Sequence, residues 1–366
     1  MLSRKILTPK LISRLYSTNS TVINEYAANR ALAFPGQGSQ FVGMGKDLYD
    51  SFASSKEVFQ HVDEILGYKL SDLMFSGDYK KLQSTENAQP AIVAVGVATI
   101  AALEQVSGYK IRNLVSYTLG HSVGEYTALI ASNSLSLPDG IRLVNLRGRS
   151  MSESIVGLDT SMVAIITRHN SLDKIVNIVK LTNQFINASV QNNEHQFNDY
   201  DLVNVSTINM SSQVTLSGTR KSVDLAIQNL QDNDIAFKAA NLPVSAPFHC
   251  DLLKPAAESL RTALAQIQFR EMQIPVISNH TGAPIASIDQ IPDLLVHQTC
   301  STVRWLDSIK FLAQSAHISR WMCPGPSPVI SSIIKKEYPR SITRLLSSSK
   351  DVYSYLDVLQ TQLKSH

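Results

Sequence analysis

This sequence has few cysteines, no long apolar run and no large excess of one charge. Its three cysteines (Cys250, Cys300 and Cys323) are too few and too scattered for a disulfide framework or a cysteine-rich metal site, so we expect reduced thiols. The longest apolar run, residues 91–103, spans 13 residues. A membrane-spanning helix needs about 20, so no span is predicted. With 366 residues, 44% of them apolar, the chain is long enough for one large globular domain or two closely joined ones.

The N-terminal segment lacks acidic residues. No Asp or Glu occurs before Glu25, and four basic residues precede position 17, at Arg4, Lys5, Lys10 and Arg14. A basic, hydroxylated and acid-free composition is typical of a mitochondrial transit peptide, which we predict over residues 1–24 with cleavage near 16/17. A basic tail without a targeting role is the alternative, and lysine and proline interrupt the apolar core that a secretory signal needs. The predicted location is the mitochondrial matrix.

Without those four residues the 33 basic side chains become 29, against 30 acidic ones. The mature chain is therefore close to neutral, and no nucleic-acid partner is expected.

The first part of the chain alternates strands with helices. An apolar strand at 31–34 runs into a glycine-rich loop at 35–40, which lacks the Gly-Lys-Ser/Thr ending of a phosphate-binding P-loop. Pro90 is expected to open an apolar helix over 91–103, in the first turn, where a missing N–H is harmless. A strand at 114–119 then meets the turn 120–124, and a helix follows. This order predicts a parallel sheet covered by helices.

The middle of the chain has a different order, βαββαβ, which is the ferredoxin-like pattern. Its predicted strands are 162–167, 202–208, 213–216 and 235–239, and its predicted helices are 171–181 and 221–230. The predicted fold class is therefore α/β, with an α/β-hydrolase-like large domain at 28–157 and 243–350. A ferredoxin-like small domain at 158–242, with a polar surface loop at 191–201, is inserted into it.

Ser122 lies in a Gly-His-Ser-Val-Gly turn between the strand at 114–119 and a helix. In a Gly-x-Ser-x-Gly nucleophile elbow the serine hydroxyl is exposed at the start of the helix. The amide of Val123 then points at an oxyanion forming on the acyl carbon, and the helix dipole favours the same negative charge. We predict that Ser122 is the nucleophile of an acyl-transferring enzyme.

A serine nucleophile needs a base, and His249 is the candidate among nine histidines. It ends the proline-punctuated segment 242–249, which leaves the small domain and returns to the large one, where a cleft is expected. His121 is too close along the chain to fold back onto Ser122. Cys250 is a weaker candidate for the nucleophile. It is adjacent to His249 along the chain, so its side chain should point away from the site that His249 faces.

Arg147 is the third informative residue. In a helix over 138–152 it falls on the apolar side with Val144, whereas Arg142 and Arg149 fall on the polar side. A buried arginine needs an anion, because an unpaired buried charge costs several kcal/mol. Two interpretations follow: a structural ion pair with an internal Asp or Glu, or a bidentate clamp on a substrate carboxylate.

These residues belong to a longer series of motifs, and over residues 31–330 the chain resembles malonyl-CoA:acyl carrier protein transacylases. The matching segments, in order, are 34–40 with 43–45, Gln89-Pro90-Ala91, Gly120 to Glu125, Arg147-Gly148, Asn209 with 213–218, Pro247-Phe248-His249, Gln298 with Val303-Arg304-Trp305, and Gly325-Pro326 with Val329-Ile330. Thr302, Ser327 and Cys250 depart from the family's usual proline, glycine and serine.

The resemblance implies a mechanism. Ser122 takes the malonyl group from malonyl-CoA with His249 as base, and the phosphopantetheine thiol of acyl carrier protein then takes it from the serine. The backbone carbonyl of Gln298 replaces the triad acid, and the amides of Gln37 and Val123 form the oxyanion hole.

The resemblance also implies how the acyl group is chosen. Arg147 holds the malonyl carboxylate with Asn209 nearby, and Phe248 disfavours an α-methyl branch. It implies no cofactor and no metal, and a role in mitochondrial type II fatty acid synthesis.

Two other classes of function share some of these features. A serine esterase or thioesterase of α/β-hydrolase type shares the elbow, but predicts an acidic triad member and no carboxylate clamp. A non-catalytic module that binds carrier protein would not need Ser122, His249 and Arg147 together. Lys335, Lys336 and Arg340 form a basic patch that either meets an acidic partner or is simply solvated. The sequence leaves the oligomeric state open, and we expect a monomer.

Overall fold

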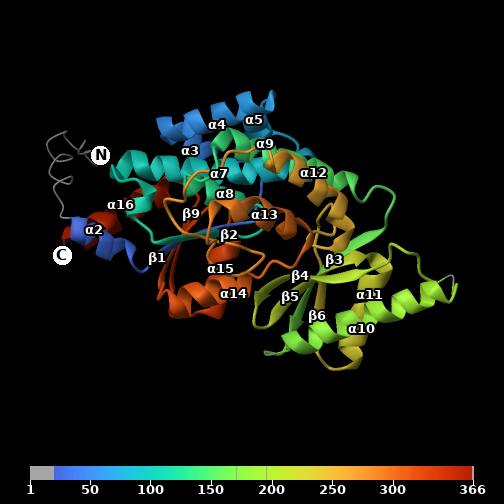
Figure 1. The fold of residues 1–366 in the computed structure, drawn as a ribbon. Coiled ribbons are helices and arrows are strands. Elements are labelled where there is room, and N and C mark those ends of the chain that lie inside the picture. The colour runs from blue at the N-terminus through green and yellow to red at the C-terminus, as the bar shows by residue number, and fades with distance from the viewer. Residues whose placement is uncertain (1–19, 170, 195, 365–366) are drawn as a thin grey trace.

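Two β-sheets organise the chain in the computed structural model, which describes residues 20–169, 171–194 and 196–364 (Figure 1). The first sheet has five parallel strands in the order β7-β2-β1-β8-β9. They are β1 (Arg30–Phe34), β2 (Tyr117–Gly120), β7 (Val276–Ile277), β8 (Arg320–Pro324) and β9 (Ile342–Leu346). The second has four antiparallel strands in the order β4-β5-β3-β6. They are β3 (Thr160–Thr167), β4 (Val203–Met210), β5 (Gln213–Thr219) and β6 (Ala236–Asn241). The predicted α/β fold class is confirmed.

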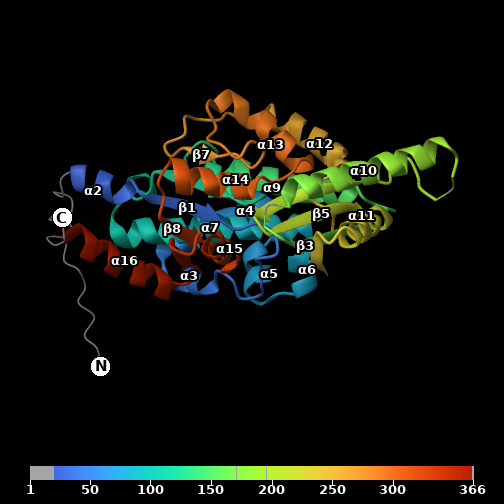
Figure 2. The same cartoon turned by 90° about the horizontal axis from the view of Figure 1, so that it is seen from below.

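Helices cover both sheets, as the two views show (Figures 1 and 2). Before the small sheet they are α2 (Ser20–Ala27), α3 (Lys46–Ser51), α4 (Ala53–Leu66), α5 (Leu70–Ser76), α6 (Tyr79–Gln83), α7 (Thr85–Ser107), α8 (Gly124–Ala131) and α9 (Leu137–Glu153). Within and after it they are α10 (Leu172–Gln191), α11 (Arg220–Asp232), α12 (Lys254–Leu264), α13 (Ile291–Cys300), α14 (Trp305–Lys310), α15 (Val329–Glu337) and α16 (Ser349–Lys364).

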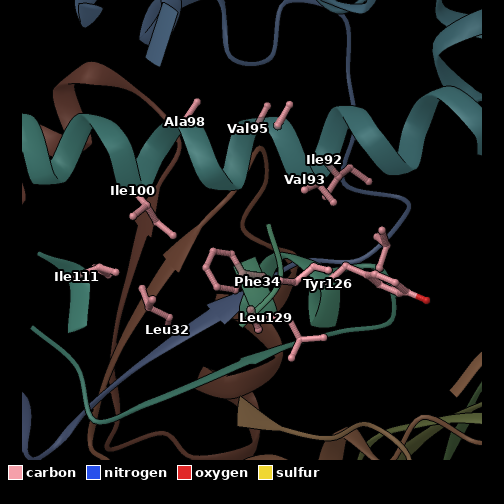
Figure 3. Close-up of a cluster of buried hydrophobic side chains, with 14 of the residues drawn as sticks. Leu32, Phe34, Ile92, Val93, Val95, Ala98, Ile100, Ile111, Tyr126 and Leu129 are labelled. Atoms are coloured by element: carbon pink, nitrogen blue, oxygen red, sulfur yellow. The ribbon is translucent and has the colours of Figure 1, made fainter. Parts of the chain in front are cut away.

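The parallel sheet is buried on both faces because its central strand is apolar throughout. Leu32 and Phe34 of β1 point toward α7, where they meet residues such as Val95 in the core of Figure 3. Ala31 and Ala33 point the other way, into a second cluster with Trp305 and Trp321. Alternate residues of a strand face opposite sides, so a continuous apolar run is what a strand covered on both sides requires.

The helix predicted over 91–103 is longer than its apolar run and begins earlier, at Thr85, so Pro90 lies inside it rather than opening it. Proline has no N–H to donate to the carbonyl of Glu86, one turn back. The side-chain amide of Asn145, on the neighbouring helix α9, donates to that carbonyl instead at 3.0 Å. Packing against α9 therefore replaces the bond that proline removes, which no local pattern reveals.

Helix α7 is also long and apolar enough, by length and composition alone, to cross a membrane. However, 72% of its most apolar window is buried inside the folded chain, where it forms the centre of the main core.

The ferredoxin-like order β3-α10-β4-β5-α11-β6 appears within the predicted range 158–242. Alternation along each strand gives the small sheet two different faces. Val163 and Val214, for example, pack with helices α10 and α11, whereas Met162 and Thr215 face a cavity on the other side. Helix α10 extends ten residues beyond the predicted end at 181, because Thr182 and Ile186 continue its buried stripe. The predicted strand 114–119 is shorter in the structure and begins at Tyr117.

Both ends of the large unit extend beyond the predicted limits of 28 and 350. Helix α2 packs against α16, and the hydroxyl groups of Tyr26 and Tyr355 lie 2.7 Å apart. The side chain of Ile23 is buried in the main core. Most of the predicted transit peptide, residues 1–19, lies outside the described residues. A cut near 16/17 would leave α2 whole, whereas removal of all of 1–24 would shorten it.

Candidate active site

The strand-turn-helix around Ser122 has the geometry of a nucleophile elbow. Strand β2 ends at Gly120, helix α8 begins at Gly124, and Ser122 between them has a left-handed backbone with φ 53°. A Cβ on Gly120 would lie 2.0 Å from the carbonyl of Gly124, and one on Gly124 would lie 2.7 Å from the carbonyl oxygen of Phe34. Both glycines are therefore required by close approach of the backbone, as the sequence motif predicts.

The side chain of Asn279 holds the elbow from beyond strand β7. Its Oδ1 accepts from the amide of Ser122 at 2.7 Å, and its Nδ2 donates to the carbonyl of Gly120 at 2.7 Å. These bonds fix a backbone conformation that costs an L-residue about 1–3 kcal/mol. Because β2 and β7 are parallel neighbours, the segments that follow them meet at one edge of the sheet.

At that edge of the sheet, His249 and Ser122 are arranged as a base and a nucleophile. The Ser122 Oγ lies 2.7 Å from His249 Nε2, and His249 Nδ1 lies 2.7 Å from the backbone carbonyl oxygen of Gln298. A carbonyl can only accept, so Nδ1 carries the proton and Nε2 is free to accept from the serine. Burial, together with the Arg147 charge, lowers the pKa of His249 to about 3 and keeps the ring neutral.

Arg147 reaches the same serine from helix α9. It is 1% exposed, and its terminal nitrogens donate to Ser122 Oγ at 3.1 Å, Gln298 Oε1 at 2.9 Å and Gln89 Oε1 at 2.9 Å. Among the described residues it forms no ion pair with an acid. The structural ion pair considered for Arg147 is therefore wrong. Its charge is buried beside the nucleophile and has no counter-ion of its own.

Gln298 connects these groups. Its side-chain Nε2 donates to the backbone carbonyl of Ser122 at 2.8 Å and to Glu125 Oε2 at 2.9 Å, which turns its Oε1 toward Arg147. Glu125 is fully buried, and burial raises the pKa of its carboxyl to about 7. One residue thus positions the histidine through its backbone and the arginine and serine through its side chain.

A cavity of about 270 Å³ opens beside Ser122, between the parallel sheet and the small sheet. Its lining residues are Gly36, Gln37, Gly38, Ser39, His121, Ser122, Met162, Ala164, Thr207, Asn209, Gln213, Thr215, Leu242, Val244, Phe248, His249, Val329, Ile330 and Ile333. Within the parts of the chain that the structure describes, no group of three or more His, Cys, Asp or Glu side chains is arranged to hold a metal ion.

Comparison with known proteins identifies the family. The chain is 34% identical to the malonyl CoA-acyl carrier protein transacylase of Bacillus subtilis (strain 168) over 333 residues, which cover 91% of this chain and 98% of the relative. It is 32% identical to that of Escherichia coli (strain K12), covering 84% and 92%. The chain belongs to the malonyl CoA-acyl carrier protein transacylase family. Residues 32–180 also match the acyl transferase domain family model.

Solved structures agree with this assignment. An acyl-carrier-protein-S-malonyltransferase from Bartonella henselae superposes with a TM-score of 0.81 at 31% identity, covering 91% of this chain and 99% of that one. A malonyl-transacylase solved in complex with a type II PKS acyl-carrier protein superposes with a TM-score of 0.80 at 30% identity, covering 90% and 99%.

Three of the remaining predicted site residues line the cavity, and Val123, directly after Ser122, is buried. The three are Gln37, Asn209 and Phe248, and Asn209 Oδ1 lies 2.9 Å from His121 Nε2. The amide of Ser122 is engaged by Asn279. Those of Gln37 and Val123, in contrast, form no hydrogen bond with any described residue, so both are available to a ligand.

Cys250 is buried and is not a competing nucleophile. Its thiol donates to the carbonyl of Pro247 at 2.8 Å, and burial raises its pKa to about 12. A thiol with that pKa contains almost no thiolate near neutral pH. The basic residues Lys335, Lys336 and Arg340 are exposed, and Lys335 donates to the carbonyl of Ser341 at 2.8 Å.

Three residues of the site carry no role in the sequence interpretation: Gln89, Glu125 and Asn279. Gln89 and Glu125 lie inside motifs that match the family, so the sequence draws attention to them but does not predict which residues they contact. Asn279 follows a strand of only two residues, and its one available signal is its place at the carboxyl end of a parallel strand.

Proposed function

We propose that this chain transfers the malonyl group of malonyl-CoA to the phosphopantetheine thiol of acyl carrier protein, by a ping-pong mechanism through an ester on Ser122. The family members named above carry this activity in their names, and one similar structure contains an acyl-carrier protein. A single observation supports the proposal best: the Ser122 hydroxyl lies between a neutral histidine at 2.7 Å and an arginine without a counter-ion at 3.1 Å.

In the first half-reaction, Ser122 Oγ attacks the thioester carbonyl carbon while His249 Nε2 takes the hydroxyl proton. The carbon–sulfur bond then breaks, and the protonated histidine returns the proton to the departing CoA thiolate. A neutral imidazole is needed at the start, and burial provides it. The amides of Gln37 and Val123, which have no hydrogen-bond partner among the described residues, would hold the oxyanion. Removal of one such donor costs about 3–4 kcal/mol in hydrolases.

In the second half-reaction, the carrier's thiol gives its proton to His249 and attacks the ester carbonyl. The ester carbon–oxygen bond breaks, and Ser122 recovers the proton, leaving malonyl on the carrier as a thioester. Gln298 keeps His249 in the same tautomer throughout, because its carbonyl oxygen can only accept from Nδ1.

The choice of acyl group rests on Arg147 and Phe248. The Arg147 guanidinium has a planar fork that suits the malonyl carboxylate, and amide and hydroxyl oxygens, rather than a carboxylate, accept its hydrogen bonds among the described residues. Phe248 is buried at the cavity wall next to His249, where its ring limits the room for an α-branch. Asn209 is held by His121 and offers a further polar contact to the acyl chain.

A serine esterase or thioesterase is less well supported by the same geometry. Such an enzyme uses an acid to orient the catalytic histidine. Here His249 Nδ1 meets the Gln298 backbone carbonyl, and the nearby acid, Glu125, contacts the Gln298 side chain instead.

The proposed setting is mitochondrial fatty acid synthesis in the matrix, with the chain acting as a monomer that needs no cofactor or metal. The support for this location is the basic, acid-free composition of the N-terminal segment. Mass analysis of the N-terminus of the protein recovered from mitochondria tests it. A mature chain starting near residue 17 is expected, whereas an uncleaved chain outside mitochondria would contradict it.

The activity itself is tested by following the malonyl-enzyme after excess malonyl-CoA is removed. Addition of phosphopantetheinylated acyl carrier protein should transfer one malonyl group to the carrier, much faster than water releases it as malonate. Carrier without the phosphopantetheine arm is the matched control and should accept nothing. Rapid release as malonate in the presence of the carrier would favour a thioesterase.

A further inference from the structure

Two neutral amides hold the Arg147 guanidinium where an internal ion pair would ordinarily use acids. Gln89 Oε1 accepts from one terminal nitrogen at 2.9 Å, and Gln298 Oε1 accepts from the other at the same distance. Arg147, Gln89 and Gln298 are all at most 1% exposed, so the arrangement is shielded from bulk solvent. A buried arginine held by amide oxygens is positioned but not neutralised.

The surroundings fix which end of each amide faces the arginine. Gln89 Nε2 lies 3.7 Å from Met151 Sδ, and Gln298 Nε2 donates to Ser122 and to Glu125. In both side chains the nitrogen is engaged elsewhere, which leaves the oxygen for Arg147. Neither glutamine can rotate by half a turn without losing these bonds.

The Gln298 side chain also contacts an acid, Glu125. Glu125 Oε2 lies 2.9 Å from Gln298 Nε2, and Gln298 Oε1 in turn lies 2.9 Å from Arg147. The Gln298 amide therefore lies between the Glu125 carboxyl and the Arg147 guanidinium.

We propose that Gln89 is a specificity-determining residue: its side chain has no charge, so it fills the place beside Arg147 without neutralising the charge that a carboxylate-bearing acyl group needs. This inference rests on the proposed function. Glutamate has nearly the same shape as glutamine, so a carboxylate at position 89 would take the same place and form an ion pair with Arg147. The malonyl carboxylate would then enter a site with no net charge to receive it, while an uncharged acyl group would be little affected.

Gln89 gives a cleaner test than Gln298. A carboxylate at position 298 would also face Glu125 across 2.9 Å, and the backbone of that residue positions His249. At position 89, the other described side-chain contact is to a methionine sulfur. The charge change at Gln89 is thus confined to Arg147.

The experiment measures the initial rate of Ser122 acylation by malonyl-CoA and by acetyl-CoA, using intact mass, in three variants. In Gln89→Glu the malonyl rate should fall about 100-fold or more, while the acetyl rate changes less than about threefold. In Gln89→Met, which removes the acceptor without adding charge, the malonyl-to-acetyl ratio should stay within about threefold of wild type. Gln105→Glu, an exposed position on the same helix, should behave as wild type in both rates.

Retained malonyl preference in Gln89→Glu, or equal loss of both rates in that variant, would overturn the proposal. A large fall in the malonyl-to-acetyl ratio of acylation rates in Gln89→Met would also overturn it. The proposal therefore remains falsifiable even if Gln89→Glu does not fold. Wild-type protein that takes up no malonyl group would instead contradict the proposed function.

Discussion

Ser122 and His249 meet at 2.7 Å, and both have a left-handed backbone, with φ values of 53° and 59°. Left-handed conformations are uncommon outside glycine, less so for asparagine, aspartate and histidine, and each costs about 1–3 kcal/mol. Both members of the pair therefore have an unfavourable backbone conformation, and at Ser122 neighbouring side chains stabilise it. Asn279 bonds the amide of Ser122, and the Gln298 side chain bonds its carbonyl.

Removal of the Asn279 side chain should weaken both stability and catalysis. Asn279→Ala leaves the buried amide of Ser122 and carbonyl of Gly120 without partners, each worth about 1–3 kcal/mol. We expect the free energy of unfolding, measured with urea, to fall by about 2–4 kcal/mol, and the malonylation rate of the remaining folded protein to fall at least about tenfold. Asn113→Ala, at an exposed asparagine, is the matched control. An unchanged rate would show that the elbow keeps its shape without Asn279.

Removal of the arginine charge should separate malonyl from uncharged acyl groups. Arg147→Ala should lower Ser122 malonylation about 100-fold or more, because the substrate carboxylate loses the buried cation that contacts the nucleophile. Acetylation should fall far less. Exposed Arg149→Ala on the same helix is the control. Equal loss of both reactions would mean that Arg147 has a structural role alone.

His249 should remain neutral across the working range. Burial lowers its pKa to about 3, so its imidazole resonances in an NMR titration should not move between about pH 5 and 8. The His249→Ala variant identifies the signals. A midpoint between pH 6 and 7 for His249 would contradict the neutral base.

Glu125 should make stability depend on pH. Its pKa is about 7 in the folded chain, against 4.5 as its ordinary value, so the native state holds a proton that the unfolded chain has released. Between these values stability falls as pH rises, since the folded state binds more protons. Relative to wild type, Glu125→Gln should therefore gain about 1–3 kcal/mol between about pH 5 and 8. A difference independent of pH would show that Glu125 is ionised throughout.

Local sequence patterns predicted much of the site. The elbow motif placed Ser122 between a strand and a helix, and helical periodicity placed Arg147 on a buried face. The proline-containing loop after the small domain indicated His249 as the base. The family resemblance predicted that the Gln298 carbonyl orients it. Each of these signals is contained in a short stretch of sequence.

The contacts that were not predicted join distant parts of the chain. Gln89 and Arg147 lie 58 positions apart, and Ser122 and Asn279 lie 157 apart. The internal position of Pro90 likewise depends on a side chain of α9 that replaces its missing bond. Such features depend on how helices and strands pack, which a single sequence records only through the whole fold.

The most direct test is the mass of the intact protein after incubation with malonyl-CoA alone. The account predicts the addition of one malonyl group, located on Ser122 by peptide mapping, and no addition in Ser122→Ala. Wild-type protein whose mass does not change, or a malonyl group that persists in Ser122→Ala, would contradict it.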